Sequence, residues 1–359
     1  MLLELAGENL RNLNAFSIEP GEQINVVVGR NAAGKTSLLE AIYILSVGRT
    51  FRAARLDEVI RSGCDSAWVR GHARDIASTR STRLGIARSK GSTVCRVDGQ
   101  NVGSAAELAR YLPVQILHPE SHRLLSGSPA HRRAFIDWGC FYQDSRFFPA
   151  WTRFRRALNQ RNAALKQRSD LRVLSSIEAE YCAAAEQVDI FRSEYIDSLR
   201  VSLAQMSGLW PTDNGWDLEY RRGWGMDRPL SEILSSEREQ ARRVGHSLAG
   251  PQRAELLVKS NGERVSSVFS RGQLKRAAAA LLLSQTRAFE RTTSRDVLVL
   301  VDDLPSELDA EAREVLLSTL AERGRQCFIT ALSPNDLDLT ATAEHRMFHV
   351  EHGRLSELV

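Results

Sequence analysis

The chain has 359 residues, of which 43% are hydrophobic and 26% are charged, and its formal net charge is +4. This composition is typical of a globular protein with a sizeable core and excludes a disordered or fibrous chain. No apolar run approaches the roughly eighteen residues of a membrane span, and the five scattered cysteines form no Cys-x-x-Cys pair, which argues against a disulfide framework or a zinc site. We expect a cytoplasmic protein without a secretory signal or membrane contact.

The N-terminal part predicts a strand, a glycine-containing loop and a helix. Residues 2–18 have the pattern of two short strands, and "INVVV" at 24–28 has that of a buried strand. "GRNAAGKT" follows and fits the phosphate-binding pattern G-x-x-x-x-G-K-[ST], and "KTSLLEAIYILSVG" then has helical spacing with Gly48 as its stop. In such a loop, backbone N–H groups surround the phosphates of ATP, Lys35 reaches the β- and γ-phosphate oxygens, and the Thr36 hydroxyl ligates Mg²⁺. The predicted nucleotide-binding residues are Gly29, Arg30, Asn31, Ala32, Ala33, Gly34, Lys35 and Thr36.

The middle of the chain has a different pattern of hydrophobic and charged residues. Residues 82–102 predict a hairpin around "SKGS", and from about residue 121 the pattern is that of long, charged, amphipathic helices. Strand patterns return near "WDLEYRRGW" and "RAELLVKSNGERVSSV".

The C-terminal part alternates helix and strand, which is typical of an α/β fold. The expected elements are a helix at 274–287, a strand at 297–301, a helix at 310–323 and a strand at 326–331. We therefore predict a head built from residues 1–120 and 250–359, with a mainly helical lobe, residues 121–249, inserted between them.

An acidic pair ends the strand at 297–301. "VLVLVDD" places Asp302 and Asp303 after five apolar residues. Asp302 is the expected carboxylate linked to Mg²⁺, and Asp303 is placed to polarise the attacking water as general base. Following a phosphate loop, this pair is a strong indication of a nucleotide-hydrolysing site.

A polar tetrapeptide, "SRGQ" at 270–273, precedes a run of alanine and leucine. Either Ser270, Arg271, Gly272 and Gln273 cap only their own helix, or this helix end faces an anion. The tetrapeptide lies about thirty residues before Asp302, the order and spacing of the signature motif in ABC-type ATPases. In that fold the signature closes on ATP held by a second subunit, so the composite site implies a two-fold homodimer.

Nearly the whole chain resembles the RecF family of ABC-type ATPases, which is related to the SMC group. The resemblance is carried by "NLRNL", "GRNAAGKTSLLEAIYILSVGRTFR", "SPAHRRAFIDWGCF", "FSRGQLK" and "VDDLPSELD". It implies an ATPase head with an inserted helical lobe and no long coiled coil, with ATP and Mg²⁺ as cofactors. It also implies that Gln115 senses the metal and the γ-phosphate as a catalytic glutamine, and that "SELD" at 306–309 lines the dimer seam.

The function implied by this resemblance is recombinational repair and replication restart. It consists of a slow, DNA-stimulated ATPase and an ATP-driven dimer that clamps single-stranded and duplex DNA, preferentially at gap junctions. The dimer would act with RecR and RecO to load RecA, with a role in SOS induction.

Four departures from the family pattern concern the rate of hydrolysis more than ATP binding. Ala32 stands where a glycine is usual, and we expect its methyl group to require a negative φ. Pro305 precedes the predicted seam segment, and Gln252 replaces a common histidine. No switch histidine follows the last core strand, which leaves Thr330 or Ser333 to contact the γ-phosphate.

Sequence-independent DNA binding needs arginines arrayed along phosphates. The candidates are three pairs: Arg52 and Arg55, Arg132 and Arg133, and Arg155 and Arg156. For each pair the alternative is an ordinary solvated face. Two other classes of function are an ATPase that serves a transporter and a small-molecule kinase; the kinase would have no use for "SRGQ" or "SELD".

Overall fold

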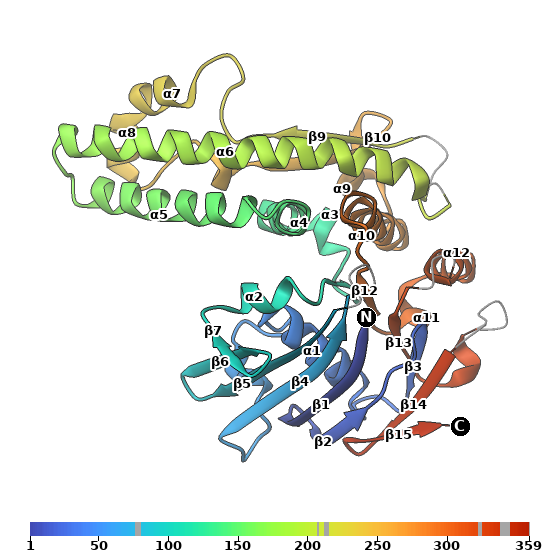
Figure 1. Cartoon of the computed structure of the whole chain (residues 1–359). Helices are drawn as coiled ribbons and strands as arrows, with labels where there is room; N and C mark the ends of the chain where they lie inside the picture. The colour runs from blue at the N-terminus through green and yellow to red at the C-terminus, as the bar shows by residue number, and fades with distance from the viewer. Residues whose placement is uncertain (76–79, 207, 212–214, 322–324, 338–344, 359) are drawn as a thin grey trace. The chain divides into compact units, whose positions relative to one another are not determined.

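The computed structural model describes residues 1–75, 80–206, 208–211, 215–321, 325–337 and 345–358 (Figure 1). The chain divides into two compact units. The head unit comprises Met1–Ser121, Gly208–Pro211 and Lys275–Val359, and the helical unit comprises His122–Ser207 and Thr212–Leu274.

The second boundary between the units differs from the predicted one. The head was predicted to resume at residue 250, whereas residues 250–274 group with the helical unit. The reason is strand pairing, since Glu255–Ser260 pairs antiparallel with Asp217–Arg221, with Leu256 opposite Tyr220. A strand pattern in the sequence does not say which sheet the strand joins.

The head unit contains two six-stranded sheets. One is antiparallel, with the order β2 (Leu13–Ile18), β1 (Leu2–Leu10), β4 (Ser66–Arg74), β5 (Ser81–Ser89), β6 (Ser92–Val97), β7 (Gln100–Val102). The other has the order β15 (Arg354–Leu358), β14 (His345–Glu351), β3 (Ile24–Val28), β13 (Cys327–Ala331), β12 (Leu298–Val301), β8 (Val114–Leu117). In the second sheet every pair is parallel except β14 and β15. Parallel order brings the carboxyl ends of β3, β12 and β13 to one edge, where the loops after these strands meet.

Helix α1 joins the two sheets of the head. It packs against strands of the antiparallel sheet on one side and against β8 and β13 on the other. Its side chains and those of both sheets form one continuous hydrophobic core. The helices and 3₁₀ turns of the head are α1 (Lys35–Val47), η1 (Leu56–Val59), α2 (Ala105–Ala109), α11 (Leu304–Glu307), α12 (Ala310–Ala321) and η4 (Pro334–Asp336), with most of α10 (Arg271–Thr293).

The helical unit is built around the paired helices α5 and α6 (Figure 1). Its elements are α3 (Arg123–Ser126), α4 (Pro129–Gln143), α5 (Phe147–Lys166), α6 (Leu171–Leu203), η2 (Ala204–Met206), β9 (Asp217–Arg221), α7 (Leu230–Ser236), α8 (Arg238–Val244), η3 (Pro251–Arg253), β10 (Glu255–Ser260), β11 (Glu263–Arg264) and α9 (Val265–Val268). At 33 residues α6 is about 50 Å long, in keeping with the expected absence of a long coiled coil. The helical unit also buries charged side chains, because Arg161 of α5 is fully buried and donates to Glu178 of α6 at 2.9 Å.

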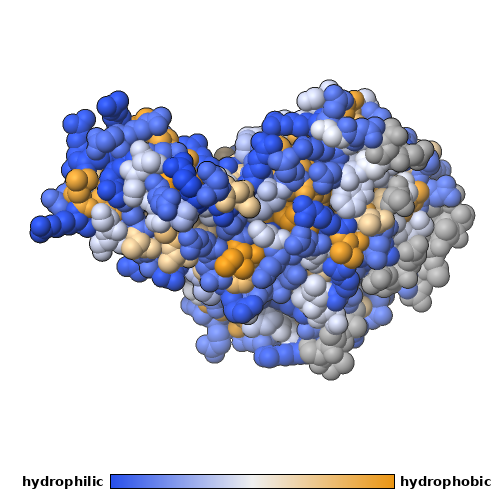
Figure 2. Space-filling view, turned by 90° about the horizontal axis from the view of Figure 1, so that it is seen from above, coloured by the Kyte–Doolittle hydropathy of each residue, from blue (hydrophilic) through white to orange (hydrophobic). Residues whose placement is uncertain are grey.

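The face of the molecule shown in Figure 2 is largely hydrophilic. On the face shown in Figure 2, hydrophobic residues form small, separate spots among hydrophilic ones. None of the described helices is both long enough and apolar enough to cross a bilayer.

A buried ion pair in the head gives a test of its stability. Arg325 donates to both oxygens of Glu290, at 2.5 and 2.7 Å, and both side chains are less than a tenth exposed. We expect Glu290→Ala to lower the free energy of unfolding by about 3–5 kcal/mol, because the buried guanidinium loses its counter-charge.

Urea denaturation checks this value. The matched control is Glu22→Ala, which removes the partner of Arg74 at the surface and should cost less than about 1 kcal/mol. Equal losses for the two variants would contradict the assignment of Arg325–Glu290 as a structural pair.

Candidate nucleotide-binding site

The loop between β3 and α1 has the backbone shape of a phosphate cradle. Gly29 and Gly34 have φ values of 155° and 130°, which side chains rarely allow. Each also lacks room for a Cβ, which would lie 2.4 Å from the Val350 carbonyl oxygen at Gly29 and 2.8 Å from Leu13 at Gly34. The helix begins at Lys35, so its free N–H groups face the loop.

Ala32 contradicts the expectation of a negative φ. Its φ is +63°, the left-handed region, at a cost of about 1–2 kcal/mol relative to glycine. The amide of Asn12 compensates, since its Nδ2 donates to the Ala32 carbonyl at 2.7 Å while its Oδ1 accepts from the Ser37 hydroxyl at 2.7 Å. One side chain from the turn between β1 and β2 thus connects the loop, at Ala32, to the first turn of α1, at Ser37.

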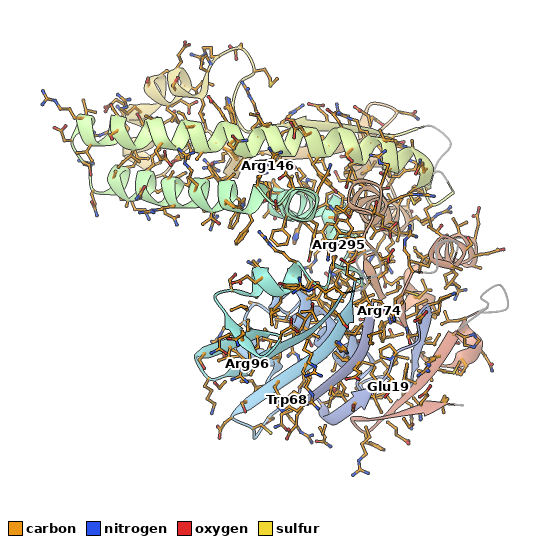
Figure 3. All side chains as sticks on the ribbon, viewed as in Figure 1. Glu19, Trp68, Arg74, Arg96, Arg146 and Arg295 are labelled. Carbon is orange, nitrogen blue, oxygen red and sulfur yellow. The ribbon has the colours of Figure 1, made fainter. Side chains whose placement is uncertain are left out.

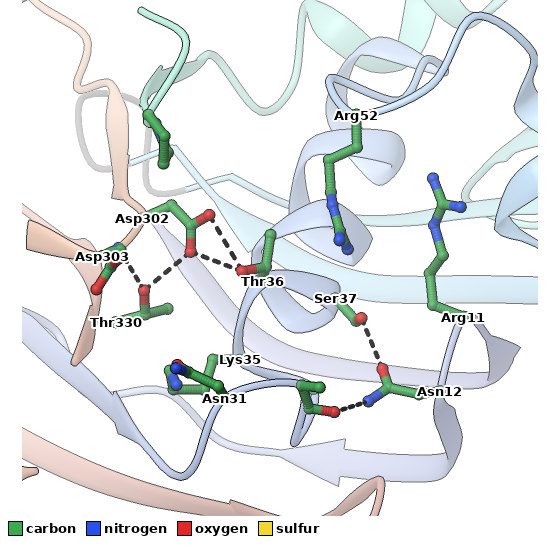
Figure 4. Close-up of a pocket in the computed structure, with 13 residues that line it drawn as sticks. Arg11, Asn12, Asn31, Lys35, Thr36, Ser37, Arg52, Asp302, Asp303 and Thr330 are labelled. Carbon is green, nitrogen blue, oxygen red and sulfur yellow. Dashed lines mark hydrogen bonds between the residues drawn. The ribbon is translucent and has the colours of Figure 1, made fainter. Parts of the chain in front are cut away.

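The loop borders a cavity of about 550 Å³ (Figure 4). Of the eight predicted loop residues, the cavity is lined by Asn31, Ala32, Gly34, Lys35 and Thr36. The carbonyl oxygens of Gly29 and Arg30 accept hydrogen bonds from the Lys35 ammonium at 2.6 and 3.1 Å, and the N–H of Ala33 donates to Arg30. Burial lowers the pKa of Lys35, and the nearby carboxylates of Asp303 and Asp302 oppose this effect.

Asp302 lies at the centre of the site. It is 5% exposed, and the Thr36 hydroxyl donates to its two oxygens at 2.9 and 3.1 Å (Figure 4). The Thr330 hydroxyl, at the end of β13, donates to the same carboxylate at 2.9 Å. Burial raises the pKa of Asp302 above its ordinary value, against the two hydroxyl hydrogen bonds, which lower it.

Asp303 turns away from the strand and into the cavity. Its backbone is left-handed, with φ 56° and ψ 47°, and its N–H donates to the Thr330 hydroxyl at 2.7 Å. Thr330 therefore holds both acids, as acceptor for one and donor to the other. A strained backbone at an acidic residue beside a phosphate loop is typical of a functional position.

The donor set suits Mg²⁺. Thr36 Oγ1 and Asp302 Oδ1 lie 2.9 Å apart, close to the separation of adjacent oxygens around an ion with bonds of about 2.0–2.1 Å. Mg²⁺ is usually held by one or two protein oxygens together with substrate phosphates and water. Thr36 and Asp302 fit this description.

Two arginines at the cavity complete the cationic side of the site. Arg11 and Arg52 line the cavity with Lys35, and both approach the fully buried Glu40 of α1. Arg11 donates to the two Glu40 oxygens at 2.9 Å each, and Arg52 lies 3.7 Å from Glu40. Neither Arg11 nor Asn12 is among the site residues predicted from motifs, although both belong to the "NLRNL" block that carries the resemblance.

The prediction for Gln115 is wrong in this structure. Gln115 lies inside β8, opposite Val299, three residues before the position opposite Asp302. Three strand residues span about 10 Å, so Gln115 lies about 10 Å before the level of Asp302 at the carboxyl end of the sheet, and its side chain is buried. Pro119, farther along the same segment, lines the cavity instead.

The tetrapeptide "SRGQ" forms the first turn of α10. The N–H of Ser270 donates to Gln273 Oε1 at 2.8 Å, and the N–H of Gln273 donates to Ser270 Oγ at 3.3 Å, which is a reciprocal capping box. Gly272 is exposed, and only Ser270 Oγ, at 4.0 Å, is near the position of a Cβ there. Capping therefore explains Ser270 and Gln273, and packing within the described chain gives no reason for Gly272.

Other predicted positions have structural roles. Ser333 caps η4 and does not line the cavity. Gln252 accepts a hydrogen bond from the Tyr181 hydroxyl at 2.9 Å. In "SELD", Glu307 is buried and paired with Lys275 at 3.2 Å, which connects α11 to α10. The side chain of Ser306 lies outside the described residues.

The six arginines predicted to contact DNA separate into groups. Arg132 is a correction, because it is 9% exposed and its guanidinium donates to both Glu255 oxygens, at 2.6 and 2.8 Å, and to carbonyls. Arg133 donates to the Ala254 carbonyl, and Arg52 lies at the nucleotide cavity. Arg155 and Arg156 of α5 are exposed, and so is Arg55, which pairs only with nearby Asp57 among the described residues.

The raised pKa of Asp302 has a measurable consequence for stability. Because the folded chain holds this proton to higher pH than the unfolded chain, stability falls as the pH rises through the interval above the ordinary pKa of about 3.9. We expect Asp302→Asn to raise the melting temperature of the nucleotide-free protein at pH 7, because the neutral amide removes the cost of burying a charge.

Thermal melts between about pH 3.5 and 8 check this, and the difference from wild type should close below about pH 4. The control is Asp65→Asn, a fully exposed position paired with Lys90, which should not change the profile. A lower melting temperature of Asp302→Asn at pH 7 would contradict the burial argument.

Comparison with known proteins agrees with this geometry. The family model described as RecF/RecN/SMC N terminal domain matches residues 1–356. The chain is 41% identical over 353 residues to the DNA replication and repair protein RecF of Thioalkalivibrio sulfidiphilus, with 98% of each chain covered. It is 38% identical to the protein of the same name from Vibrio parahaemolyticus, with 99% of each chain covered.

Solved structures show the same relationship. A structure of the recombination mediator protein RecF-ATP in the RecFOR pathway superposes with a TM-score of 0.90 at 25% identity, covering 100% of this chain and 97% of that one. The Smc head domain of Pyrococcus furiosus shares the fold, with a TM-score of 0.59 at 15% identity, covering 99% and 96%. The family model matches almost all of the chain, and relatives named RecF are 38–41% identical to it over nearly its whole length. The chain therefore belongs to the RecF family.

Proposed function

We propose that this chain binds and hydrolyses Mg-ATP and uses the nucleotide to form a dimer that holds DNA during recombinational repair and replication restart. The observation that carries the proposal is the cavity in which the phosphate loop, Thr36, Asp302, Asp303 and Thr330 meet. The solved relative named RecF-ATP supports the choice of nucleotide.

The residues of the head divide the work of hydrolysis. The N–H groups of the loop and of the first turn of α1 would bind the phosphates, with Lys35, Arg11 and Arg52 neutralising their charge. Thr36 and Asp302 would hold Mg²⁺, which neutralises the charge that develops on the transferred phosphoryl group. Asp303, at the cavity wall, would orient and deprotonate the attacking water, which makes it a catalytic residue.

A second copy would complete the site. Gly272 leaves the start of α10 open, at a helix cost of about 1 kcal/mol relative to alanine, and this cost has no explanation in the packing of one described chain. A γ-phosphate approaching the N–H groups of Ser270, Arg271, Gly272 and Gln273 supplies one, since bulk at Gly272 would keep it away. Hydrolysis would remove the bridging phosphate, so the dimer would open again.

DNA and protein partners follow from the family. The relatives' name, DNA replication and repair protein, supports an action on DNA. We propose that the chain binds single-stranded and duplex DNA, preferentially at gap junctions. The RecFOR pathway in the name of the solved relative supports cooperation with RecR and RecO. We propose in addition that the chain helps to load RecA, takes part in SOS induction, is a slow DNA-stimulated ATPase and works in the cytoplasm. Of the six candidate arginines, Arg52, Arg55, Arg155 and Arg156 are exposed. Arg52 lies at the nucleotide cavity, which leaves Arg55, Arg155 and Arg156 as the proposed contacts to DNA phosphates.

Two substitutions separate nucleotide binding from dimer formation. We expect Lys35→Met to weaken ATP binding by the monomer at least tenfold, because the charge at the β- and γ-phosphates is removed. We expect Ser270→Arg to leave monomer binding within about twofold, because Ser270 serves the partner's site, and to abolish ATP-driven dimerisation, as Lys35→Met also does.

Fluorescent-nucleotide titration measures the first property, and light scattering with a non-hydrolysable analogue and Mg²⁺ measures the second. A wild-type chain that stays monomeric when saturated with the analogue, even with gapped duplex present, would refute the dimer. Loss of nucleotide binding in Ser270→Arg would refute the assignment of Ser270 to the partner's site.

A salt titration tests the proposed DNA-binding arginines of α5. We expect the double variant Arg155→Gln with Arg156→Gln to bind duplex more weakly and to reduce the slope of log affinity against log salt by about one for each phosphate that is no longer neutralised. Arg153→Gln on the same helix is the matched control, because Glu180 already holds Arg153 through two hydrogen bonds.

Fluorescence anisotropy with a labelled duplex gives both affinities and slopes. ATP binding should be the same in all three proteins. An unchanged slope in the double variant would remove Arg155 and Arg156 from the DNA interface.

A further inference from the structure

The outward face of the antiparallel sheet of the head carries a hollow that the nucleotide site does not use. Successive residues of a strand point to opposite faces, so the buried residues of β4, β5 and β6 enter the core and the alternate ones face outward. The hollow's outward-facing lining is formed by Trp68, Arg70, Arg83, Gly85, Ala87, Val94 and Arg96. Trp68 and Arg96 are labelled on this sheet in Figure 3.

Three arginines make the hollow cationic. Arg70, Arg83 and Arg96 are exposed, and none of them pairs with a carboxylate of the described residues. Arg96 donates to the Asn101 amide at 3.0 Å, and the guanidinium of Arg70 lies 5.4 Å from the ring centre of Trp68. The cavity lining contains no acidic residue among those the structure describes.

The floor of the hollow is apolar and has a gap at its centre. Trp68, Ala87 and Val94 are aligned in neighbouring strands and form an apolar row. In the adjacent row Gly85 stands between Arg70 and Arg96. A Cβ at Gly85 would meet only the Arg96 Cβ, at 3.9 Å, so the space above this residue is open.

We propose that this hollow binds an acidic segment of another protein that carries one apolar side chain. The apolar side chain would lie over Gly85 against Trp68 and Val94. Arg70 and Arg96 are two strands apart, so they present their charges about 10 Å from each other on either side of that position. Carboxylates flanking the apolar side chain would pair with them, while Arg83 adds a third cation at the rim. This inference does not depend on the proposed ATPase.

The apolar floor favours a protein partner over nucleic acid. Trp and Arg around a desolvated pocket are typical of the central contacts of protein interfaces. A phosphate backbone would use the arginines and leave the Ala87 and Val94 surface in water. Stacking of a nucleic-acid base on Trp68 is disfavoured, because the guanidinium of Arg70 already lies over the Trp68 ring. The Trp68 Nε1 also donates to Glu8 at 3.0 Å, and this carboxylate beside the hollow would repel a phosphate backbone.

A random peptide library displayed on phage, selected against the full chain, tests the proposal. We expect the enriched peptides to share an apolar residue flanked by Asp or Glu. Their binding should fall at least tenfold in Arg96→Glu and in Gly85→Ile. A Cβ at Gly85 has room, and isoleucine has a high strand propensity, so we expect Gly85→Ile to occupy the hollow and to retain the fold, which circular dichroism and thermal melting check.

Arg354→Glu is the matched control, since Arg354 is an exposed arginine on β15 of the other sheet. It should bind the selected peptides within twofold of wild type. The proposal is overturned if no sequence is enriched, if the enriched peptides lack acidic residues, or if Arg96→Glu and Gly85→Ile bind them like wild type. Loss of oligonucleotide binding in Gly85→Ile, with no peptide selected, would assign the face to nucleic acid instead.

Discussion

The candidate site depends on one buried carboxylate. Asp302 joins three segments of the chain. It directly follows β12, and it accepts hydrogen bonds from Thr36 at the start of α1 and from Thr330 near the end of β13. The cost of burying its charge is offset in part by these two hydroxyl groups. The strand order of the parallel sheet, with β13 between β3 and β12, is what brings the three segments to one edge. The position of Asp303 follows, since its backbone is held by the same threonine.

Local patterns were enough to predict the elements that surround the site. The strand at 24–28 and the helix that ends before Gly48 have the predicted bounds, because hydrophobic spacing and a left-handed glycine are local signals. The hairpin in 82–102 is also confirmed, as β5 and β6. Strand β4 and the pair β14 and β15 were not predicted. Their role comes from pairing with distant strands, as in β14 with β3, and the sequence does not encode such partners locally.

Side-chain partners were harder to predict than backbone elements. Arg132 and Arg155 are both arginines on amphipathic helices. Arg132 is buried and paired with Glu255, which lies 123 residues later on a strand, whereas Arg155 is exposed. The predicted role of Gln115 failed for a related reason. The register of β8 against β12 decides how far each residue lies from the carboxyl end of the sheet, and the sequence does not state this register. The hydrogen-bond partner of the Ala32 carbonyl is likewise distant in sequence, since it is Asn12, a residue twenty positions earlier.

The ion pair between Lys275 and Glu307 joins two parts of the proposed machinery. Lys275 lies two positions after the "SRGQ" tetrapeptide, and Glu307 lies four residues after Asp303. Both side chains are largely shielded from solvent, so salt screens this attraction less than it would a surface pair. A substitution that breaks this ion pair would alter neither the phosphate loop nor Asp302 and Asp303. It would, however, uncouple the start of α10, which is proposed to contact the second copy, from the turn that follows Asp303. The ion pair is therefore a natural place for separation-of-function alleles, in which nucleotide binding by the monomer survives and subunit association does not.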